Sequence, residues 1–470
     1  MADAGGEWGL AALVAGHLLL GELVLVIALI IAVSAADDLF VDLVYFGRWL
    51  WRRMQPPTPR ATAEMLHQVA PAPMAIIIPA WDESNVIGAM LARLLATLDY
   101  PDYRVFVGLY PNDPAGRAAV AAIPDARIAP VLCSRPGPTT KSDCLNHLWR
   151  AVLADERARG RIFKAVVLHD AEDVLHPQEL RVQNALIPGL AMVQLPVVPL
   201  PDKTSPWVAG HYLDEFAANH LKDIAVRQAL GAAVPSAGVA CAIERTMLGR
   251  IAEVGGGDPF DATCLTEDYE LGLRIKALGG GTALVRVREA NGGLVATEAH
   301  FPATFETARR QKTRWLLGIA LSGWDRLGWP RGAADRYMLL RDRKAVVAAL
   351  LAMVAYAVTL LILLDSVLVA SVPALAALPP LLGPLAMTLT LVNIVLLAWR
   401  LAMRAACTAY GHGWREAARS VPRAVVSNVI NAAAAWSACR RYAAALRSGD
   451  APQWDKTVHR FPHPEAESAA

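Results

Sequence analysis

A long apolar segment near the amino terminus constrains this chain more than any other feature of its sequence. From Leu10 to Val33 nearly every residue is Leu, Val, Ile, Ala or Gly, and the first 47 residues contain no Lys or Arg. About 20 apolar residues are enough to cross a lipid bilayer. A cleaved signal peptide would carry a basic leader and a shorter apolar core, whereas this leader carries Asp3 and Glu7. We therefore predict a retained membrane anchor with a juxtamembrane helix over residues 1–55.

A second apolar region, 345–399, also contains no Lys or Arg and is interrupted by prolines between 372 and 380. This pattern predicts two more spans joined by a short turn. Residues 423–438 are rich in Ala and Val but include Asn428 and Asn431. That segment fits an interfacial helix at least as well as a fourth span. The expected membrane part therefore has three to four spans.

Basic residues gather on the cytoplasmic side of membrane spans. Here they lie at 48–53, before the second apolar region at 336–344, and after it at 400–404. We therefore expect a multi-pass membrane protein with the middle of the chain in the cytoplasm. The amino terminus and the turn at 372–380 would face outward.

The composition fits this membrane assignment and excludes other classes of protein. Of 470 residues, 55% are hydrophobic and 19% are charged, and the mean hydropathy is +0.33. A chain this apolar is not intrinsically disordered. The net charge of +2 argues against a partner held by phosphate contacts, so we expect no nucleic-acid partner. Six cysteines without a Cys-x-x-Cys pair indicate reduced, mostly buried thiols.

Between the apolar regions the sequence predicts a globular domain. Four short runs, 75–80, 105–110, 127–133 and 165–170, are mostly apolar without a polar alternation, and polar turn residues follow each one. Such runs suit strands buried on both faces of a parallel sheet. The pattern is that of a doubly wound α/β domain, in which ligands bind beyond the carboxyl ends of the strands.

The expected organisation has six parts: the anchor (1–55), a proline-rich linker (56–73), the α/β domain (74–305), interface helices (306–344), two spans (345–399), and interfacial helices with a tail (400–470).

Carboxylates follow three of these predicted strands. Asp82 and Glu83 follow the first run, and Asp113 follows the second. A helix cap and ordinary turn chemistry are the simpler explanations of these two groups. The fourth run ends in Asp170-Ala171-Glu172-Asp173, where like charges would repel one another without a cation. A hard divalent metal bound through oxygens favours such a cluster, and a solvated acidic turn is the alternative.

Two later motifs add chemistry. Thr266-Glu267-Asp268 opens a predicted helix, where Thr266 could act only as its cap. Gln311, Arg314 and Trp315 follow a basic approach. An interfacial aromatic belt would also account for Trp315.

The ordered set of these motifs, with Lys141 between them, resembles the processive membrane glycosyltransferases of family 2, which include the cellulose, chitin and hyaluronan synthases. The sequence around the motifs, such as His-Asp-Ala-Glu-Asp and Gln-Lys-Thr-Arg-Trp, is most similar to the phage adsorption protein B family. The resemblance implies an α/β fold: a Rossmann-like cytoplasmic domain of the GT-A type within an α-helical transmembrane protein. The adsorption family commonly carries an additional carboxyl-terminal domain that senses cyclic di-GMP. We find no such sensor motif in the tail, so we expect that nucleotide to act at most through a partner.

The resemblance also implies a reaction and its residues. A sugar would pass from a UDP-sugar donor to an acceptor hydroxyl with inversion, and Mg²⁺ or Mn²⁺ would bind the diphosphate. The expected metal ligands are Asp170 with Glu172 or Asp173. The expected donor-binding residues are Glu83, Asp113, Lys141, Asp170 and Arg314. The expected catalytic residues are Asp268, as the general base, and its neighbour Glu267. The expected acceptor-binding residues are Gln311, Trp315, Ser236 and Gly238.

The function that follows is elongation of a polysaccharide at the inner membrane, coupled to its export with a possible periplasmic or outer-membrane partner. Two alternatives remain open. One is transfer of a single sugar to a polyprenyl phosphate or another lipid acceptor. The other is a scaffold for export or phage adsorption without turnover.

Overall fold

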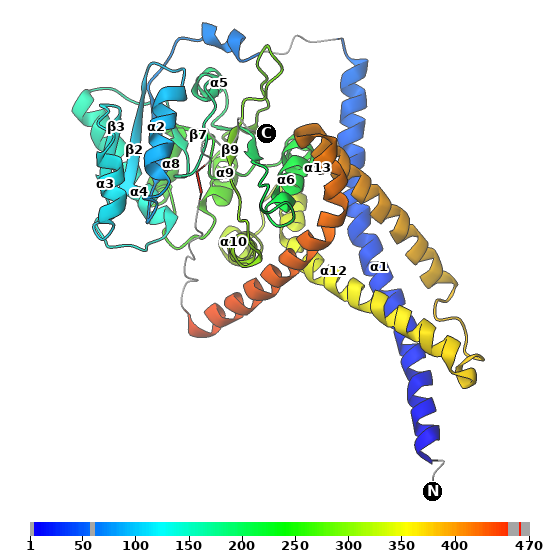
Figure 1. Ribbon diagram of the computed structural model, residues 1–470. Coiled ribbons are helices and arrows are strands. Elements are labelled where there is room, and N and C mark those ends of the chain that lie inside the picture. The colour runs from blue at the N-terminus through cyan, green and yellow to red at the C-terminus, as the bar shows by residue number, and fades with distance from the viewer. Residues whose placement is uncertain (1–3, 57–61, 450–459, 462–470) are drawn as a thin grey trace.

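The computed structural model describes residues 4–56, 62–449, 460 and 461. It consists of an α/β domain and three long helices that extend away from it (Figure 1). The long helices are α1 (Ala4–Met54), α12 (Ala333–Ser371) and α13 (Pro384–Ser448). Within the described ranges, these three are long and apolar enough to cross a membrane. Each apolar segment predicted as a span therefore lies in one long helix.

The domain contains a mixed sheet. Among the described residues its strand order is β3-β2-β1-β4-β7-β5-β8. The strands are β1 (Met74–Pro79), β2 (Tyr103–Leu109), β3 (Ile128–Leu132), β4 (Ala165–Leu168), β5 (Met192–Gln194), β7 (Cys241–Glu244) and β8 (Thr282–Leu284). Strands β1 to β4 pair in parallel, as predicted, but β7 runs antiparallel to β4 and β5. A small second sheet pairs β6 (Val197–Pro199) in parallel with β9 (Thr297–Ala299).

Helices cover both faces of the main sheet. They are α2 (Ile87–Thr97), α3 (Pro114–Ala121), α4 (Lys141–Arg159), α5 (Glu179–Leu186), α7 (Ile224–Ala229), α8 (Arg245–Val254) and α9 (Glu267–Ala277). Helix α6 (Gly210–Ala218) packs instead against α13 and β6 of the second sheet. Along β1, Ile76 and Ile78 join one buried cluster with α2, whereas Ala75 and Ile77 join another with α4 and α8. Because successive side chains point to opposite faces, burial of both faces explains why the run is continuously apolar.

Three more helical elements connect the domain to the long helices. Helix α10 (Phe305–Leu316) continues through a π-helical turn at Leu317–Ser322 into α11 (Gly323–Leu327), which precedes α12. Helix α13 turns sharply at Gly413, whose φ is 80° and ψ is 173°, and its second half returns toward the domain (Figure 1). Buried residues of that half, such as Arg423 and Ile430, contact α6 and the cluster around it, while Val425 and Trp436 stay exposed. The segment 423–438 therefore packs on the domain as part of the second half of α13.

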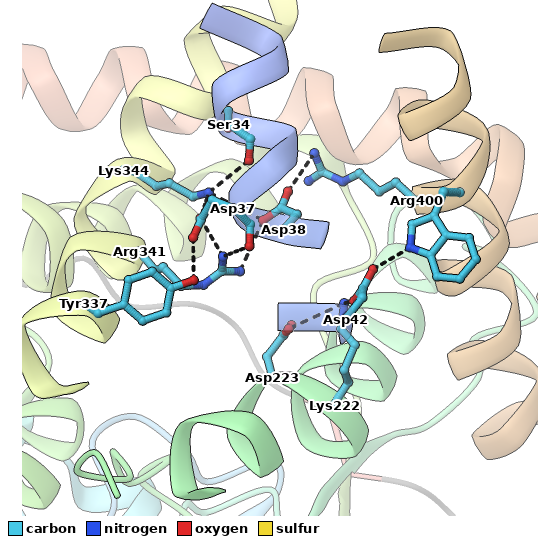
Figure 2. A network of polar contacts seen from close by, with 11 residues as sticks. Ser34, Asp37, Asp38, Asp42, Lys222, Asp223, Tyr337, Arg341, Lys344 and Arg400 are labelled. Carbon is cyan, nitrogen blue, oxygen red and sulfur yellow. Dashed lines mark hydrogen bonds and ion pairs between the residues drawn. The ribbon is translucent and has the colours of Figure 1, made fainter. Parts of the chain in front are cut away.

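A network of ion pairs joins α1 to α12, α13 and the domain (Figure 2). Asp37 of α1 pairs with Arg341 at 2.5 Å and with Lys344, both from α12. Asp42 accepts a hydrogen bond from Lys222 of the domain at 2.5 Å. The same carboxylate accepts a hydrogen bond from the Trp399 indole of α13 at 2.8 Å. The network therefore fixes all three long helices to one another and to the domain.

Candidate active site

A cavity of about 760 Å³ opens beyond the carboxyl ends of β1 and β4, facing the start of α9 and one side of α10. This is the edge of a parallel sheet at which ligands are expected. The predicted site residues in its lining are Glu83, Lys141, Asp170, Glu172, Asp173, Glu267, Asp268, Gln311, Arg314 and Trp315. Asp113, Ser236 and Gly238 lie outside the lining. Motifs about 230 residues apart in the chain are thus brought to one cavity.

The Lys141 ammonium lies among the carboxylates of this cavity. Its Nζ is 2.5 Å from Asp170 Oδ1 and 4.0 Å from Glu267 Oε1. Burial by itself would lower the pKa of Lys141, but the charges of Asp170, Glu267 and Asp268 raise it well above its usual value. Lys141 is therefore a permanent cation inside an acidic cavity.

Helix α4 holds Lys141 in place through its first two turns. Thr140 caps the helix by accepting a hydrogen bond from the Asp143 N–H at 3.2 Å, and its hydroxyl donates to the Ala262 carbonyl at 2.7 Å. Asn146 donates to the Phe260 carbonyl at 2.7 Å and accepts from the Phe260 N–H at 3.1 Å. The start of α4 is thereby tied to the loop that leads into α9.

The acidic turn after β4 rests on a buried histidine. His169 is fully buried, and its ring nitrogens lie 2.8 Å from Asp173 Oδ2 and 2.7 Å from Glu179 Oε1. Burial by itself would lower the pKa of His169, but Glu179 and Asp173 raise it to about 10. Asp173 also accepts the Asp170 N–H at 3.0 Å. Asp173 thus braces the turn from inside, and Asp170 and Glu172 are its carboxylates with greater access to the cavity.

Asp170 and Glu172 fit a hard divalent cation by their donor chemistry. No group of three or more His, Cys, Asp or Glu residues within the described parts of the chain could hold a metal ion alone. Magnesium sites commonly use one or two carboxylates and take the remaining oxygens from water and substrate phosphates. The position of Lys141 on Asp170 shows that this carboxylate already attracts a cation. A metal held by these two carboxylates would therefore need further oxygen ligands from water or from a bound phosphate group.

Burial alters the acidity of the two carboxylates at the start of α9. It raises the pKa of Glu267 to about 7, with a further contribution from the charge of Asp268. Burial also raises the pKa of Asp268, whereas the positive charge of Lys141 opposes that rise. Asp268 accepts the Tyr269 N–H at 2.7 Å. A carboxylate with a raised pKa is a better proton acceptor than an ordinary aspartate.

The structure gives a new interpretation to two predicted features near Asp268, the loop with Ser236 and Gly238 and the helix start at Thr266. Gly238 lies directly against it, since a Cβ on Gly238 would stand 2.5 Å from Asp268 Oδ2. Ser236 accounts for the shape of that loop, because its hydroxyl accepts the Gly238 N–H at 3.0 Å. Thr266 occupies the N-cap position of α9 but makes no cap hydrogen bond, so the capping interpretation is wrong. Its buried hydroxyl lines the cavity without a hydrogen-bond partner in the described part of the chain.

Helix α10 forms the opposite wall of the cavity. The Trp315 ring packs edge-on against Tyr212 of α6, with ring centroids 6.2 Å apart. Lys312 pairs with Glu215 and lies 5.1 Å from the Tyr212 ring centroid and 5.2 Å from that of Trp315. Gln311 lines the cavity and is buried, and its Oε1 has no hydrogen-bond partner within the described ranges. The indole is thus fixed by packing with one edge in the cavity.

Asp113 supports the first turn instead of facing the cavity. It caps α3 by accepting the Gly116 N–H at 2.9 Å, and it accepts the Asp82 N–H at 3.0 Å. Asp82 needs this support because its φ of 53° is unusual for a residue with a side chain. Local turn and capping chemistry therefore accounts for Asp113: its Oδ1 caps α3, and its Oδ2 holds the turn that carries Glu83.

Sequence reasoning missed an aromatic wall beside that turn. Trp81 and Tyr110 line the cavity with their rings 5.0 Å apart and 72° from parallel. The Gly137 backbone packs against the indole, since a Cβ there would lie 2.4 Å from Trp81. The position of Trp81 between the end of β1 and Glu83 could have predicted its place in the cavity wall. The loops 200–204 and 299–304 also line the cavity, and no motif marked them.

Comparison with known proteins agrees with this geometry. Residues 71–318 match the family model described as glycosyltransferase-like family 2. Bacteriophage adsorption protein B of Escherichia coli is 36% identical over 462 residues, which cover 93% of this chain and 61% of that protein. Bacteriophage N4 adsorption protein B of another Escherichia coli strain gives the same values. This chain therefore spans less than two thirds of the length of both relatives.

The solved structure of a mannosyltransferase from Pyrobaculum calidifontis, in complex with GDP-mannose and Mn²⁺, has the same fold. It covers 88% of this chain and 99% of its own, with a TM-score of 0.53 and 16% identity. The sheet order, the cavity at its carboxyl edge and the family match lead to one conclusion. This chain belongs to glycosyltransferase family 2 and has a GT-A-like fold with three long apolar helices.

Proposed function

We propose that this protein is an inverting glycosyltransferase of the bacterial inner membrane that adds sugars from a UDP-sugar to a growing polysaccharide. One observation supports this proposal most strongly. A single cavity contains the Lys141–Asp170 pair, the buried carboxylate of Asp268 and the indole of Trp315. These are the groups needed to hold a diphosphate, accept a proton and bind a sugar ring.

The donor side has to stabilise the diphosphate as it leaves. Negative charge grows on that group during transfer, so cations placed beforehand in a dry cavity lower the barrier. Lys141 supplies one such charge and Arg314, on the opposite wall, supplies another. Asp170 and Glu172 would hold Mg²⁺ or Mn²⁺, which would neutralise part of the diphosphate charge. Glu83 lies in the same lining beside Trp81, where the nucleoside would be placed.

The acceptor side has to remove a proton from the attacking hydroxyl. We assign this role to Asp268, because burial raises its pKa and its carboxylate faces the cavity. Its neighbour Glu267 would share a proton with the same cluster of carboxylates. Trp315 would stack on the acceptor sugar, and Gln311 would hydrogen-bond to it. Ser236 and Gly238 would shape the loop against which Asp268 packs.

Membrane insertion and a polymeric product are also part of the proposal. Three long apolar helices and the basic residues at their ends support a multi-pass protein with its catalytic domain in the cytoplasm. The named role of the relatives in phage adsorption is compatible with an exported surface polymer. Export would then use a periplasmic or outer-membrane partner.

The test is nucleoside diphosphate release by the purified chain with a panel of UDP-sugars, with GDP-mannose as the comparison donor. We expect turnover with one UDP-sugar that requires Mg²⁺ or Mn²⁺. Removal of the metal by EDTA, or Asp170→Asn, should lower the rate at least about 100-fold. Preference for GDP-mannose would contradict the uridine assignment, and metal-independent turnover would contradict the role of Asp170.

Product analysis separates the alternatives. Radiolabelled sugar in a polymer supports the proposed elongation. A single labelled sugar in the lipid fraction would instead establish transfer to a lipid acceptor. A chain that binds the donor without releasing nucleotide, even with membrane extract as acceptor, would favour the scaffold.

A further inference from the structure

Helix α12 touches the catalytic part of the domain through the side chain of Asp342. Asp342 Oδ2 accepts a hydrogen bond from the Tyr269 hydroxyl at 2.5 Å and another from Arg227 Nη1 at 2.7 Å. Tyr269 directly follows Asp268 and is itself buried. The backbone beside the proposed base is therefore tied to a helix that continues into the membrane.

A second carboxylate of α12 holds the other element that packs on Asp268. Asp335 lies seven residues before Asp342, which places both on one side of the helix. It accepts the Ala233 N–H at 2.7 Å, while Arg227 Nε donates to the Ala233 carbonyl at 2.5 Å. The loop that begins here ends at Gly238, against the Asp268 carboxylate. Helix α12 thus forms hydrogen bonds to both segments that lie beside Asp268, namely Tyr269 and the loop that ends at Gly238.

The same stretch of α12 is also fixed to the other long helices. Arg341 and Lys344 flank Asp342 and pair with Asp37 and Asp38 of α1 (Figure 2). Arg400 of α13 joins the same network. A change in the tilt of α1 or α12 would therefore be transmitted to Asp342.

We propose that Asp342 is a positioning residue that acts through Tyr269 on Asp268, so that the rate of sugar transfer depends on how α12 is seated in the bilayer. The proposal rests on the role of Asp268 as the base. Charge-assisted hydrogen bonds of this kind are short and strong, and they suit a link between two rigid helices. Spanning helices adjust their tilt when the hydrocarbon thickness of the bilayer changes. A change in thickness would therefore alter the contact between Asp342 and Tyr269.

Tyr269→Phe is the best variant for a test, because it removes one hydroxyl and leaves the buried Arg227–Asp342 pair intact. Asp342→Asn would weaken the partner of a buried arginine and could impair folding. Tyr442→Phe is the matched control, since its hydroxyl also donates to a carboxylate, Asp325 at 2.6 Å, but that carboxylate belongs to α11 and not to α12. Thermal unfolding confirms that each variant is folded before its kinetics are compared.

The full chain is reconstituted in bilayers of phosphatidylcholines with short, medium and long acyl chains, and kcat and KM are measured for the donor. We expect the wild-type kcat to change with thickness at unchanged KM. Tyr269→Phe should lower kcat about tenfold, a loss of about 1.4 kcal/mol, and abolish the thickness dependence. Tyr442→Phe should behave as the wild type.

Three results would overturn the coupling: a wild-type kcat that ignores thickness, a Tyr269→Phe enzyme with the wild-type kcat, or a slower variant that keeps the thickness dependence. Asp268→Asn in the same assay separates this failure from failure of the proposed function. If that variant remains active, Asp268 is not the base, whatever Tyr269→Phe does.

Discussion

Gly238 is the residue on which the placement of Asp268 depends most directly. Its φ is +78°, and an added Cβ would lie 2.5 Å from Asp268 Oδ2. We expect Gly238→Ala to push the carboxylate aside and lower kcat about 100-fold with donor binding unchanged, because small misplacements of catalytic groups are costly. Gly231→Ala is the control, since φ there is +76° but nothing lies within 4 Å of the new Cβ.

Both variants carry the same backbone strain, so any difference between them reports on Asp268. Steady-state kinetics with the preferred donor measure it. Equal losses in the two variants would show that strain alone, and not displacement of the carboxylate, lowers the rate.

His220 predicts how the stability of the domain depends on pH. Its Nδ1 accepts the Val197 N–H at 3.2 Å, and burial lowers its pKa to about 4, with Arg286 acting in the same direction. A histidine in the unfolded chain has a pKa of about 6.5. The native state therefore resists protonation, and stability that is complete above pH 6.5 is lost as the pH falls toward 4. The expected loss from this residue is up to about 3 kcal/mol.

His220→Asn keeps an acceptor for the Val197 N–H but does not titrate. Unfolding free energies measured in detergent between pH 4.5 and 7 should fall less steeply for this variant than for the wild type. An unchanged slope would show that His220 does not contribute to acid sensitivity.

At the scale of elements, Arg423 fixes the second half of α13 to the domain. The guanidinium is fully buried and lies 2.8 Å from Asp214 and 2.6 Å from Glu416. It fits because residue 210 is a glycine, whose added Cβ would meet it at 2.3 Å. Arg423→Ala leaves buried carboxylates poorly compensated, which should cost about 3–5 kcal/mol.

Arg419→Ala is the matched control on the same helix. Arg419 pairs with the same Glu416 at 2.6 Å, but its side chain is 53% exposed, so its loss should cost at most about 1 kcal/mol. Thermal or denaturant unfolding of the purified protein measures both. Similar losses in the two variants would contradict the assignment of Arg423 as the anchor.

The elements differ in how far the sequence predicted them. Strands β1, β2 and β4 were predictable because burial on both faces leaves an apolar run, whereas β3 is an edge strand that is partly exposed and was recognised by composition alone. Strands β5, β6, β8 and β9 have three residues each, which is too short for any period to show. The antiparallel β7 follows from tertiary packing between β4 and β5, which no local pattern reports.

The candidate site shows the same division. The strand ends predicted that Glu83 and the Asp170 cluster share one edge of the sheet, because the carboxyl ends of parallel strands meet there. The resemblance to family 2 was needed to add the residues on helices, which are Lys141, Asp268, Gln311, Arg314 and Trp315. The roles of Asp113 and Asp173 depend on where each carboxylate finds a backbone N–H or His169, and only the folded chain determines that. The hydrogen bond from Tyr269 to Asp342 joins distant segments, and no sequence pattern in either segment predicts it.

At the scale of the whole molecule, polar contacts hold α1 to its neighbours at two levels along its length. At one end His17 lies 3.0 Å from Asp365 of α12 and from the Pro379 carbonyl. At the other end Asp37 pairs with Arg341. At about 1.5 Å per residue they are about 30 Å apart along the helix, which matches the thickness of a bilayer core. We infer that the bilayer lies between them.

Labelling of single added cysteines tests this orientation. Ser371→Cys, at the end of α12, should react with a membrane-impermeant maleimide in intact cells. Ala154→Cys, exposed on α4, should react only after the cells are opened. The native cysteines give a low background because five are buried and the sixth is partly buried. The reverse labelling pattern would place the catalytic domain outside the cytoplasm.

The central claim is that Asp268 removes the acceptor proton in a cavity that binds the nucleotide sugar. The most direct measurement compares sugar transfer and donor binding for the wild type and Asp268→Asn, which keeps the shape of the side chain. The account predicts a loss of transfer of at least about 1,000-fold with donor affinity within about threefold of the wild type. Transfer at the wild-type rate by Asp268→Asn would contradict it.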